Sequence, residues 1–529
     1  MQLNWFDRVG EWNPQLFREL KGLFKSRNLF LAVAGSVLGQ CLIIMIFSQQ
    51  HCLRYTDSTC VELNWSIQWE FVFRTLNWIL PFLLLVSGVY SIACDLSKEV
   101  RRGTLNFIRL SPQSSQSILT GKILGVPALL YLGIALAVPL HWVSALAADE
   151  PLSWIFGLYA LWGVGCGLFY TTACFYSLLW SSPQSEPKTV AGGASLIALL
   201  LGLPYISLID FSFRLYRSDL GLGTWKWFLL PLGREPELAC TWVLITFSVA
   251  TYWIWQAANR LFRNPSATLI GKPQSYWLVS SLQVWLLGFA LPELNSVSSS
   301  TQFYVGFSIL FVLNPIGFTI LNAALSPKYQ ALQDWACYRH KSSSRDKRFF
   351  NRTLMQDLIW GEKSPTLVAI AINLLITAII WVPWVLLGTQ AIGNENFTPQ
   401  SALLGLLLTV NVILIYVAIA QLMLFMKHWQ RLVWSFGTVG AAIGLLIVVW
   451  SVWQIDPLQL PFLWLFSPLP VLALTNASAT TVFLGLLAQL SVLGLLTLQL
   501  TRQLHKAGES PSKALFAGHS SFPIGDSKQ

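Results

Sequence analysis

Apolar runs of close to twenty residues recur along the chain and alternate with short polar stretches. About 20 residues of α-helix cross the roughly 30 Å hydrocarbon core of a bilayer, so each run predicts a transmembrane helix. The predicted spans are residues 29–47, 71–94, 123–146, 154–180, 190–210, 239–259, 277–292, 303–324, 366–387, 401–426, 433–453 and 480–500. The pattern therefore predicts an all-α fold, a polytopic membrane helix bundle with about 12 transmembrane helices.

The distribution of charge predicts which side of the membrane each connection occupies. Only 11% of the residues are charged and 54% are hydrophobic, whereas soluble domains carry roughly 25% charged residues. The net charge of +10 is spread between the apolar runs and forms no single basic stripe, so nucleic acid is not an expected partner. Connections rich in Lys and Arg alternate with connections poor in them. Because such residues resist translocation, both termini are expected to be cytoplasmic.

Residues 12–27, before the first span, predict an amphipathic helix. Asn13 can cap its N-terminus, and Pro14 suits the first helical position. Leu16 and Leu20 belong to an apolar stripe, and Arg18 lies on the polar side. Such an interfacial helix is expected to lie on the lipid bilayer, along its cytoplasmic surface. The alternative is a charged tail that only sets the topology.

Residues 95–122 form the first long basic loop between predicted spans. Gly103 interrupts the preceding helix, Thr104 can cap a short helix, and Pro112 ends that helix. Its apolar side chains are Leu105, Ile108 and Leu110, and the basic pair Arg101 and Arg102 precedes it. A cationic helix that presents apolar side chains is suited to contact a soluble partner protein. The alternative is an ordinary basic loop that obeys the charge rule.

The order of these features resembles the ABC-2 type permeases, the membrane subunits of ATP-binding-cassette exporters. The matching residues are Asn13, Pro14, Arg18, Glu19 and Leu20 in the interfacial helix, and Glu99, Arg102, Gly103, Thr104, Leu105, Pro112, Gly121 and Lys122 in the loop. The resemblance covers roughly residues 12–260, about half of the chain. It implies that the loop, including Arg101 and Ile108, is a coupling helix that docks on a separate ATPase subunit. ATP and Mg²⁺ would bind to that subunit.

The same resemblance implies a permease in a bacterial-type plasma (inner) membrane that exports a lipidic, drug-like or saccharide substrate. A second copy of the chain, giving a homodimer, is a further candidate partner. The resemblance also implies a re-entrant external segment between the fifth and sixth spans. Trp227–Leu232 fits this expectation because it is apolar yet too short to cross the membrane, and the segment from Trp464 to Leu469 is similar to it.

A weak internal repeat suggests two permease-like modules. Residues between Asn13 and Leu29 align without gaps on residues between Asn351 and Leu367, at an offset of 338 positions (351 − 13). The predicted organisation is an interfacial helix at 1–28, a six-helix module at 29–262, two further helices and a cytoplasmic loop at 263–350, a second, shortened module at 351–507 and a disordered tail at 508–529. The alternative is that residues 263–529 are an accessory membrane domain.

Motifs of enzymes and of metal sites are missing from the sequence. The pairs Gly121–Lys122 and Gly271–Lys272 lack the earlier glycine and the following hydroxyl residue of a phosphate-binding loop. No HExxH motif occurs and the six His residues are scattered, so we expect no enzyme activity, no metal and no cofactor in this chain. The spans are nearly free of charge, which disfavours an ion-coupled carrier. The alternatives to an exporter permease are an ATP-independent carrier and a membrane scaffold or assembly protein.

Two cysteines share the first predicted external loop. An oxidising compartment would permit a disulfide between Cys52 and Cys60. The alternative is two unpaired thiols.

Overall fold

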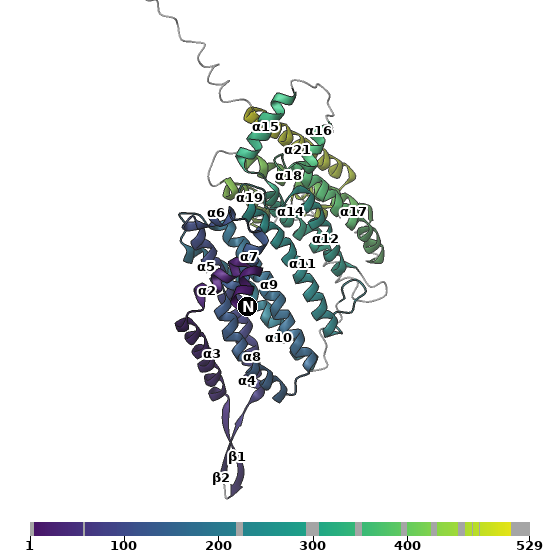
Figure 1. Ribbon diagram of the computed structural model, residues 1–529. Coiled ribbons are helices and arrows are strands. Elements are labelled where there is room, and N and C mark those ends of the chain that lie inside the picture. Colours follow the sequence, from purple (N-terminus) through teal and green to yellow (C-terminus); the bar gives the residue numbers. More distant parts are fainter. Residues whose placement is uncertain are drawn as a thin grey trace, which may run out of the picture. The chain divides into compact units, whose positions relative to one another are not determined.

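The computed structural model describes residues 5–56, 59–217, 226–291, 306–343, 352–392, 399–424, 431–452, 461–467, 469–474 and 477–508 (Figure 1). These residues are almost entirely helical, which confirms the all-α class. Within these described ranges, ten helices are long and apolar enough to cross a membrane, so the chain is a multi-pass membrane protein. It divides into two compact units, unit 1 at residues 1–265 and unit 2 at residues 266–529.

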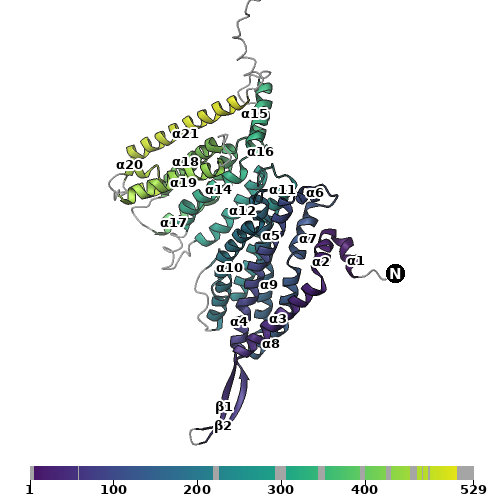
Figure 2. The ribbon, with the colours of Figure 1, turned by 90° about the vertical axis from the view of Figure 1, so that its left-hand side faces the viewer.

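Unit 1 contains the helices that cover the first six predicted spans (Figure 2). They are α1 (Trp5–Trp12), α2 (Pro14–Leu23), α3 (Ser26–Ile46), α4 (Trp69–Phe82), η1 (Leu83–Ser87), α5 (Gly88–Arg101), α6 (Thr104–Arg109), α7 (Ser115–Gly125), α8 (Ala128–Ala147), α9 (Leu152–Trp180), α10 (Pro187–Arg217) and α11 (Pro236–Arg263). The continuous segment α4–η1–α5 lies at the centre, and α8, α9 and α10 pack on it. Helix α3 instead keeps most of its apolar side chains exposed, and α11 leaves most of its apolar side chains only partly buried, as expected for helices that face lipid.

The central segment contains one turn of π-helix, η1, where the regular ladder of backbone hydrogen bonds is interrupted. Tyr170 of α9 donates a hydrogen bond of 2.8 Å to the carbonyl of Leu84 in this turn. Gly88 follows the turn, and a side chain there would collide with the Tyr170 ring. The glycine therefore allows α9 to approach closely enough for Tyr170 to donate a hydrogen bond to this turn.

The connection between α3 and α4 is a two-stranded hairpin, β1 (Ser48–Thr56) and β2 (Thr59–Ile67). Its register pairs Cys52 with Leu63 and Cys60 with Tyr55. The side chains of Cys52 and Cys60 lie outside the described part of the structure, so the disulfide between them stays a prediction.

The expected re-entrant segment Trp227–Leu232 is a tight turn in the structure. Trp227 and Leu230 form an isolated backbone bridge, and Phe228 adopts a positive φ of 51°. Residues 226–235 contain no helix, so this part of the chain does not form a helical hairpin. Pro231 lacks an amide hydrogen and cannot donate a helical hydrogen bond. In addition, the bridge between Trp227 and Leu230 holds these residues in a turn.

Unit 2 contains the helices of the second half. They are α12 (Lys272–Ala290), η2 (Ile309–Leu313), α14 (Asn314–Leu325), α15 (Tyr329–Ser343), α16 (Arg352–Trp360), α17 (Leu367–Ile392), α18 (Pro399–Leu424), α19 (Arg431–Val452), α20 (Pro461–Trp464), η3 (Pro470–Ala473) and α21 (Ala479–Gly508). Helix α12 covers a predicted span but is not among the ten described segments that are long and apolar enough to cross, while several side chains of α19 lie outside the described residues. For α12 the reason is its polar side chains, which include Lys272 and Gln283. The tail after residue 508 lies outside the described residues.

Candidate functional site

Helix α2 begins at the residues that the sequence analysis assigned to a helix start. The side chain of Asn13 accepts a hydrogen bond of 3.0 Å from the amide of Leu16, and Pro14 is the first residue of α2. The other end of the same amide group donates a hydrogen bond of 2.8 Å to the carbonyl of Ser117 in α7. The capping residue of α2 therefore also attaches α2 to α7.

The apolar stripe of α2 faces protein, which corrects the expectation that it rests on lipid. Leu16 and Leu20 are buried in a small core with Ala128. The close approach depends on glycines of α7: a Cβ at Gly121 would lie 2.9 Å from the amide nitrogen of Leu16, and a Cβ at Gly125 would lie 2.7 Å from the Cβ of Glu19. Small residues four apart let two helices approach at backbone distance. As a result, α2 packs directly along α7 (Figure 2).

Five charged side chains meet where α2, α5 and α7 come together. The ammonium nitrogen of Lys122 lies 2.6 Å from a carboxylate oxygen of Asp95 and 2.9 Å from one of Glu99. It also lies 3.3 Å from Glu19 on α2. Arg18 completes the group, at 2.7 Å from Glu99 and 3.2 Å from Glu19. We call these residues the charge cluster; it joins the interfacial helix to the loop region of α5 and α7.

Lys122 has a side chain that is only 1% exposed. Burial by itself would lower its pKa, but Asp95, Glu99 and Glu19 together raise that pKa above its ordinary value. Lys122 is therefore charged throughout the physiological pH range. Because the nearby acidic groups also raise the pKa of Arg18 against the effect of its burial, both cations of the cluster stay charged.

The three carboxylates of the cluster are close enough to one another to resemble a metal site. Oxygens of Glu19, Asp95 and Glu99 lie within 4.8 Å of one another. The Lys122 ammonium is within 3.3 Å of all three, so it already supplies a positive charge at the point where they converge. The arrangement is therefore that of an ion-pair cluster centred on a lysine.

The predicted short helix exists as α6, but its apolar residues are divided between two sides. Leu105 and Ile108 are buried, at 3% and 8% exposure, in a core with Phe262 of α11. The expectation that these two side chains face a partner is therefore wrong. The exposed side instead presents Phe107 and Leu110, at 81% and 85% exposure. Helical geometry explains this, because 105 and 108 share one face of the helix and 107 and 110 share the other.

The ends of α6 differ in detail from the prediction. Gly103 is the N-cap residue, with a left-handed φ of 73° that glycine adopts without strain. Thr104 is the first residue of the helix, and its hydroxyl donates to the carbonyl of Glu99 at 3.2 Å instead of capping α6. The helix ends at Arg109, before the exposed Pro112, and Arg101 and Arg102 are exposed beside its start.

The start of α7 is attached to the end of α11, a contact that the sequence did not reveal. Ser115 is buried; its hydroxyl donates to the Asn259 side chain at 2.5 Å and accepts from Arg263 Nε at 2.8 Å. In addition, the Arg109 guanidinium stacks over the ring of Phe262 at 5.4 Å. Burial lowers the pKa of Arg109 from its ordinary value. We call Ser115, Asn259 and Arg263 the α7–α11 joint.

The structure thus unites two sets of residues that were predicted separately. Asn13, Leu16 and Glu19 of the interfacial helix contact the part of α7 that contains Gly121 and Lys122. Neither Asp95, as a cluster member, nor Gly125 was predicted from the sequence. The spacing of Gly121 and Gly125 was a usable signal, because two small residues four apart at the start of an apolar helix favour helix contact.

Unit 2 also contains a buried lysine. Lys272 at the start of α12 is 2% exposed. Its ammonium donates to the carbonyls of Leu358 and Pro365 at 2.7 and 3.0 Å and to the hydroxyl of Ser364 at 2.6 Å. These acceptors belong to α16 and to the turn between α16 and α17, the segment that the internal repeat aligns with α2 and the start of α3.

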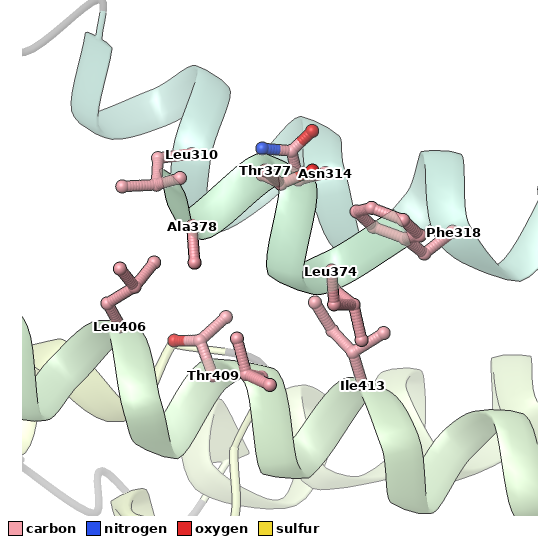
Figure 3. A pocket seen from close by; sticks show the side chains of 10 residues that line it. Leu310, Asn314, Phe318, Leu374, Thr377, Ala378, Leu406, Thr409 and Ile413 are labelled. Atoms are coloured by element: carbon pink, nitrogen blue, oxygen red, sulfur yellow. The ribbon is translucent and has the colours of Figure 1, made fainter. Parts of the chain in front are cut away.

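Unit 2 also contains polar side chains within its helical core. Gln283 of α12 donates to Asn314 at 2.7 Å and accepts from the indole nitrogen of Trp381 at 2.7 Å. Beside them is a cavity of about 10 Å³. Its polar lining residues are Asn314, Thr377 and Thr409 (Figure 3). Asn314 and Thr377 lie on one wall and Thr409 on the opposite wall, on α18. A cavity of this size holds one water molecule at most.

Comparison of the chain with protein-family models, with curated proteins and with solved structures finds no match.

Proposed function

We propose that the chain is the membrane-spanning permease subunit of an ATP-binding-cassette exporter. It moves a lipidic, drug-like or saccharide substrate with ATP hydrolysed by a separate nucleotide-binding subunit. The observation that carries the proposal is the surface of α6, where Phe107 and Leu110 are exposed on a helix whose other side is anchored in the bundle.

Exposed apolar side chains on a short anchored helix are typical of a protein-binding surface. Large apolar groups contribute most of the binding energy when a partner removes them from water. Arg101 and Arg102 are exposed just before the start of α6 and supply positive charge to this loop. This favours a cytoplasmic partner with an apolar pocket bordered by acidic residues, as the basic charge of the loop also indicates.

The surroundings of α6 suit the transfer of force into the membrane helices. The charge cluster and the glycine contact attach α2, α5 and α7 to one another, and the buried side of α6 packs among α5, α7 and α11. Closely packed interiors transmit displacement because they have little free volume. Movement of α6 by an ATPase would therefore displace several helices together.

Affinity purification of the full-length chain with co-expressed candidate ATPases tests the proposal. We expect a P-loop ATPase to co-purify with the natural chain. Phe107→Asp with Leu110→Asp should lower its recovery at least tenfold, since a charge would enter the apolar pocket, and Arg101→Glu with Arg102→Glu should lower it as well. Leu229→Asp is the matched control, because Leu229 is 94% exposed in the turn before α11. Equal recovery with Phe107→Asp/Leu110→Asp would reject the α6 surface.

One observation favours the alternative of an ATP-independent carrier. Polar side chains inside a membrane bundle mark substrate pathways in many carriers, and unit 2 buries Gln283, Asn314 and Trp381 as a hydrogen-bonded group. Gradient-driven uptake in proteoliposomes that lack any ATPase would support the carrier. Uptake that requires both ATP and the co-purifying subunit would support the exporter.

A further inference from the structure

The cytoplasmic loop proposed to dock an ATPase is attached to α11 by a buried polar contact. Ser115 is the first residue of α7 and lies six positions after Arg109, the last residue of α6. Its hydroxyl is bonded on both sides, to Asn259 and to Arg263. Ser115 and Asn259 are each 7% exposed, so water competes little for the hydrogen bond between them, whereas Arg263 is exposed.

Besides the joint, helix α11 is attached to unit 1 along α9 and through Phe262, which lies in the core beneath α6. Its contact with α7 lies at the joint. In the apolar stretch of α11 that could span a membrane, 6% of the residues are buried, against 56% in that of the central segment α4–η1–α5. Lower burial makes α11 easier to displace than the central segment. The joint therefore holds the one end of this exposed helix that lies beside α6.

Helix α11 is also the last helix of unit 1. It ends at Arg263, and α12 of unit 2 begins at Lys272, eight residues of connecting chain later. A shift of the Arg263 end is therefore transmitted along the backbone toward unit 2, however the two units are arranged.

From these contacts we propose that Ser115, Asn259 and Arg263 are positioning residues that transmit ATPase docking at α6 to α11. The inference rests on the proposed function. When the partner displaces α6 and the start of α7, the hydroxyl of Ser115 draws the Asn259 and Arg263 side chains with it, so α11 shifts against α9. The joint contacts neither nucleotide nor substrate; it acts through the position of α11.

The test uses the complex of the full chain with its co-purifying ATPase in lipid nanodiscs. Spin labels attached through an unnatural amino acid at Leu152 of α9 and Val249 of α11, both exposed, leave the eight native cysteines intact. The distance between labels is measured without nucleotide and with ATP and vanadate. The double variant Ser115→Ala/Asn259→Leu removes the joint, Ser115→Thr keeps the hydroxyl, and Ser248→Ala removes a hydroxyl that bonds only to the backbone of its own helix.

We expect the nucleotide-dependent change in distance to fall by at least half in the double variant, and to persist with Ser115→Thr and Ser248→Ala. The kcat for ATP hydrolysis should change in the double variant while the KM for ATP stays the same, because the nucleotide site is on the other subunit. A full-sized change in distance in the double variant, no change in the natural chain, or loss of ATPase binding by the double variant would each overturn the inference. Failure of any ATPase to co-purify would instead overturn the proposed function, and the inference with it.

Discussion

The two buried lysines of this chain occupy similar places in its two units and have opposite electrostatic surroundings. Lys122 and Lys272 each follow a glycine, and they are 1% and 2% exposed. Each also contacts the segment that leads into a span, through α2 in unit 1 and through α16 and its following turn in unit 2. Lys122, however, meets three carboxylates, whereas the oxygens bonded to Lys272 belong to two carbonyls and a hydroxyl.

The difference shows what a buried ammonium requires to stay charged. Burial removes hydration from both lysines and by itself lowers both pKa values. Around Lys122 the full negative charges outweigh this loss, so its pKa is raised. Around Lys272 the neutral hydrogen-bond acceptors and the charge of Asp357 do not outweigh the loss of hydration, and the pKa of Lys272 falls to about 8. Hydrogen bonds alone therefore hold the Lys272 side chain in place but do not fully offset its burial.

Removal of the Lys122 charge should have the largest effect on stability. Lys122→Met leaves Glu19, Asp95 and Glu99 facing one another with only Arg18 to balance them. Loss of one partner from a buried ion pair costs about 3–5 kcal/mol. We expect a clear fall in the thermal unfolding temperature of the purified chain in detergent, with α2 losing protection from hydrogen exchange first.

Neutralising the acids as well separates charge imbalance from lost packing. The variant that combines Lys122→Met with Glu19→Gln, Asp95→Asn and Glu99→Gln should recover much of the stability, because the one charge that remains in the cluster, that of Arg18, is half exposed to water. If it is as unstable as Lys122→Met alone, packing of the lysine side chain, and not its charge, holds the cluster together.

Raising the pH should act on the two lysines differently. A base whose pKa falls on folding holds more protons in the unfolded state between the two pKa values, so the free energy of unfolding rises with pH in that window. For Lys272 the window runs from about 8 to the ordinary 10.5, and the gain is on the order of 2–3 kcal/mol. The contribution of Lys122 to the free energy of unfolding is fully present at pH values below 10.5, the pKa of the lysine in the unfolded chain. This contribution is lost only at higher pH, because the pKa of Lys122 is raised in the folded protein.

Denaturant unfolding in detergent from pH 8 to 10.5 measures this difference. Lys272→Met should remove the rise with pH that the natural chain shows, while Lys122→Met should lower stability by the same amount at each pH in the window. A rise that persists in Lys272→Met would assign it to other titrating groups and contradict the low pKa of Lys272.

Much of this arrangement followed from the sequence, and the remainder depended on contacts distant along the chain. The cap at Asn13 and the turn at Gly103 are local features, so spacing and residue type predicted their places. Burial of Leu105 and Ile108 was not predictable, because it depends on Phe262, more than 150 positions later. The sequence also does not show which face of an amphipathic helix meets protein and which meets lipid, since both surroundings are apolar.

The smallest expected effect comes from a substitution next to Lys122 that changes the steric fit between helices and leaves the charges unchanged. Gly121→Ala keeps all five charges of the cluster but places a methyl group 2.8 Å from Asn13 Oδ1 and 2.9 Å from the Leu16 amide nitrogen. Backbone cannot move aside as a flexible side chain can, so α2 must shift away from α7, at about 1–3 kcal/mol. Hydrogen exchange should then increase across α2. Gly22→Ala is the control, because a methyl group at that position would meet no neighbouring group within 4 Å. Equal exchange in the two variants would mean that the charge cluster alone fixes α2, and that the glycines of α7 are dispensable for it.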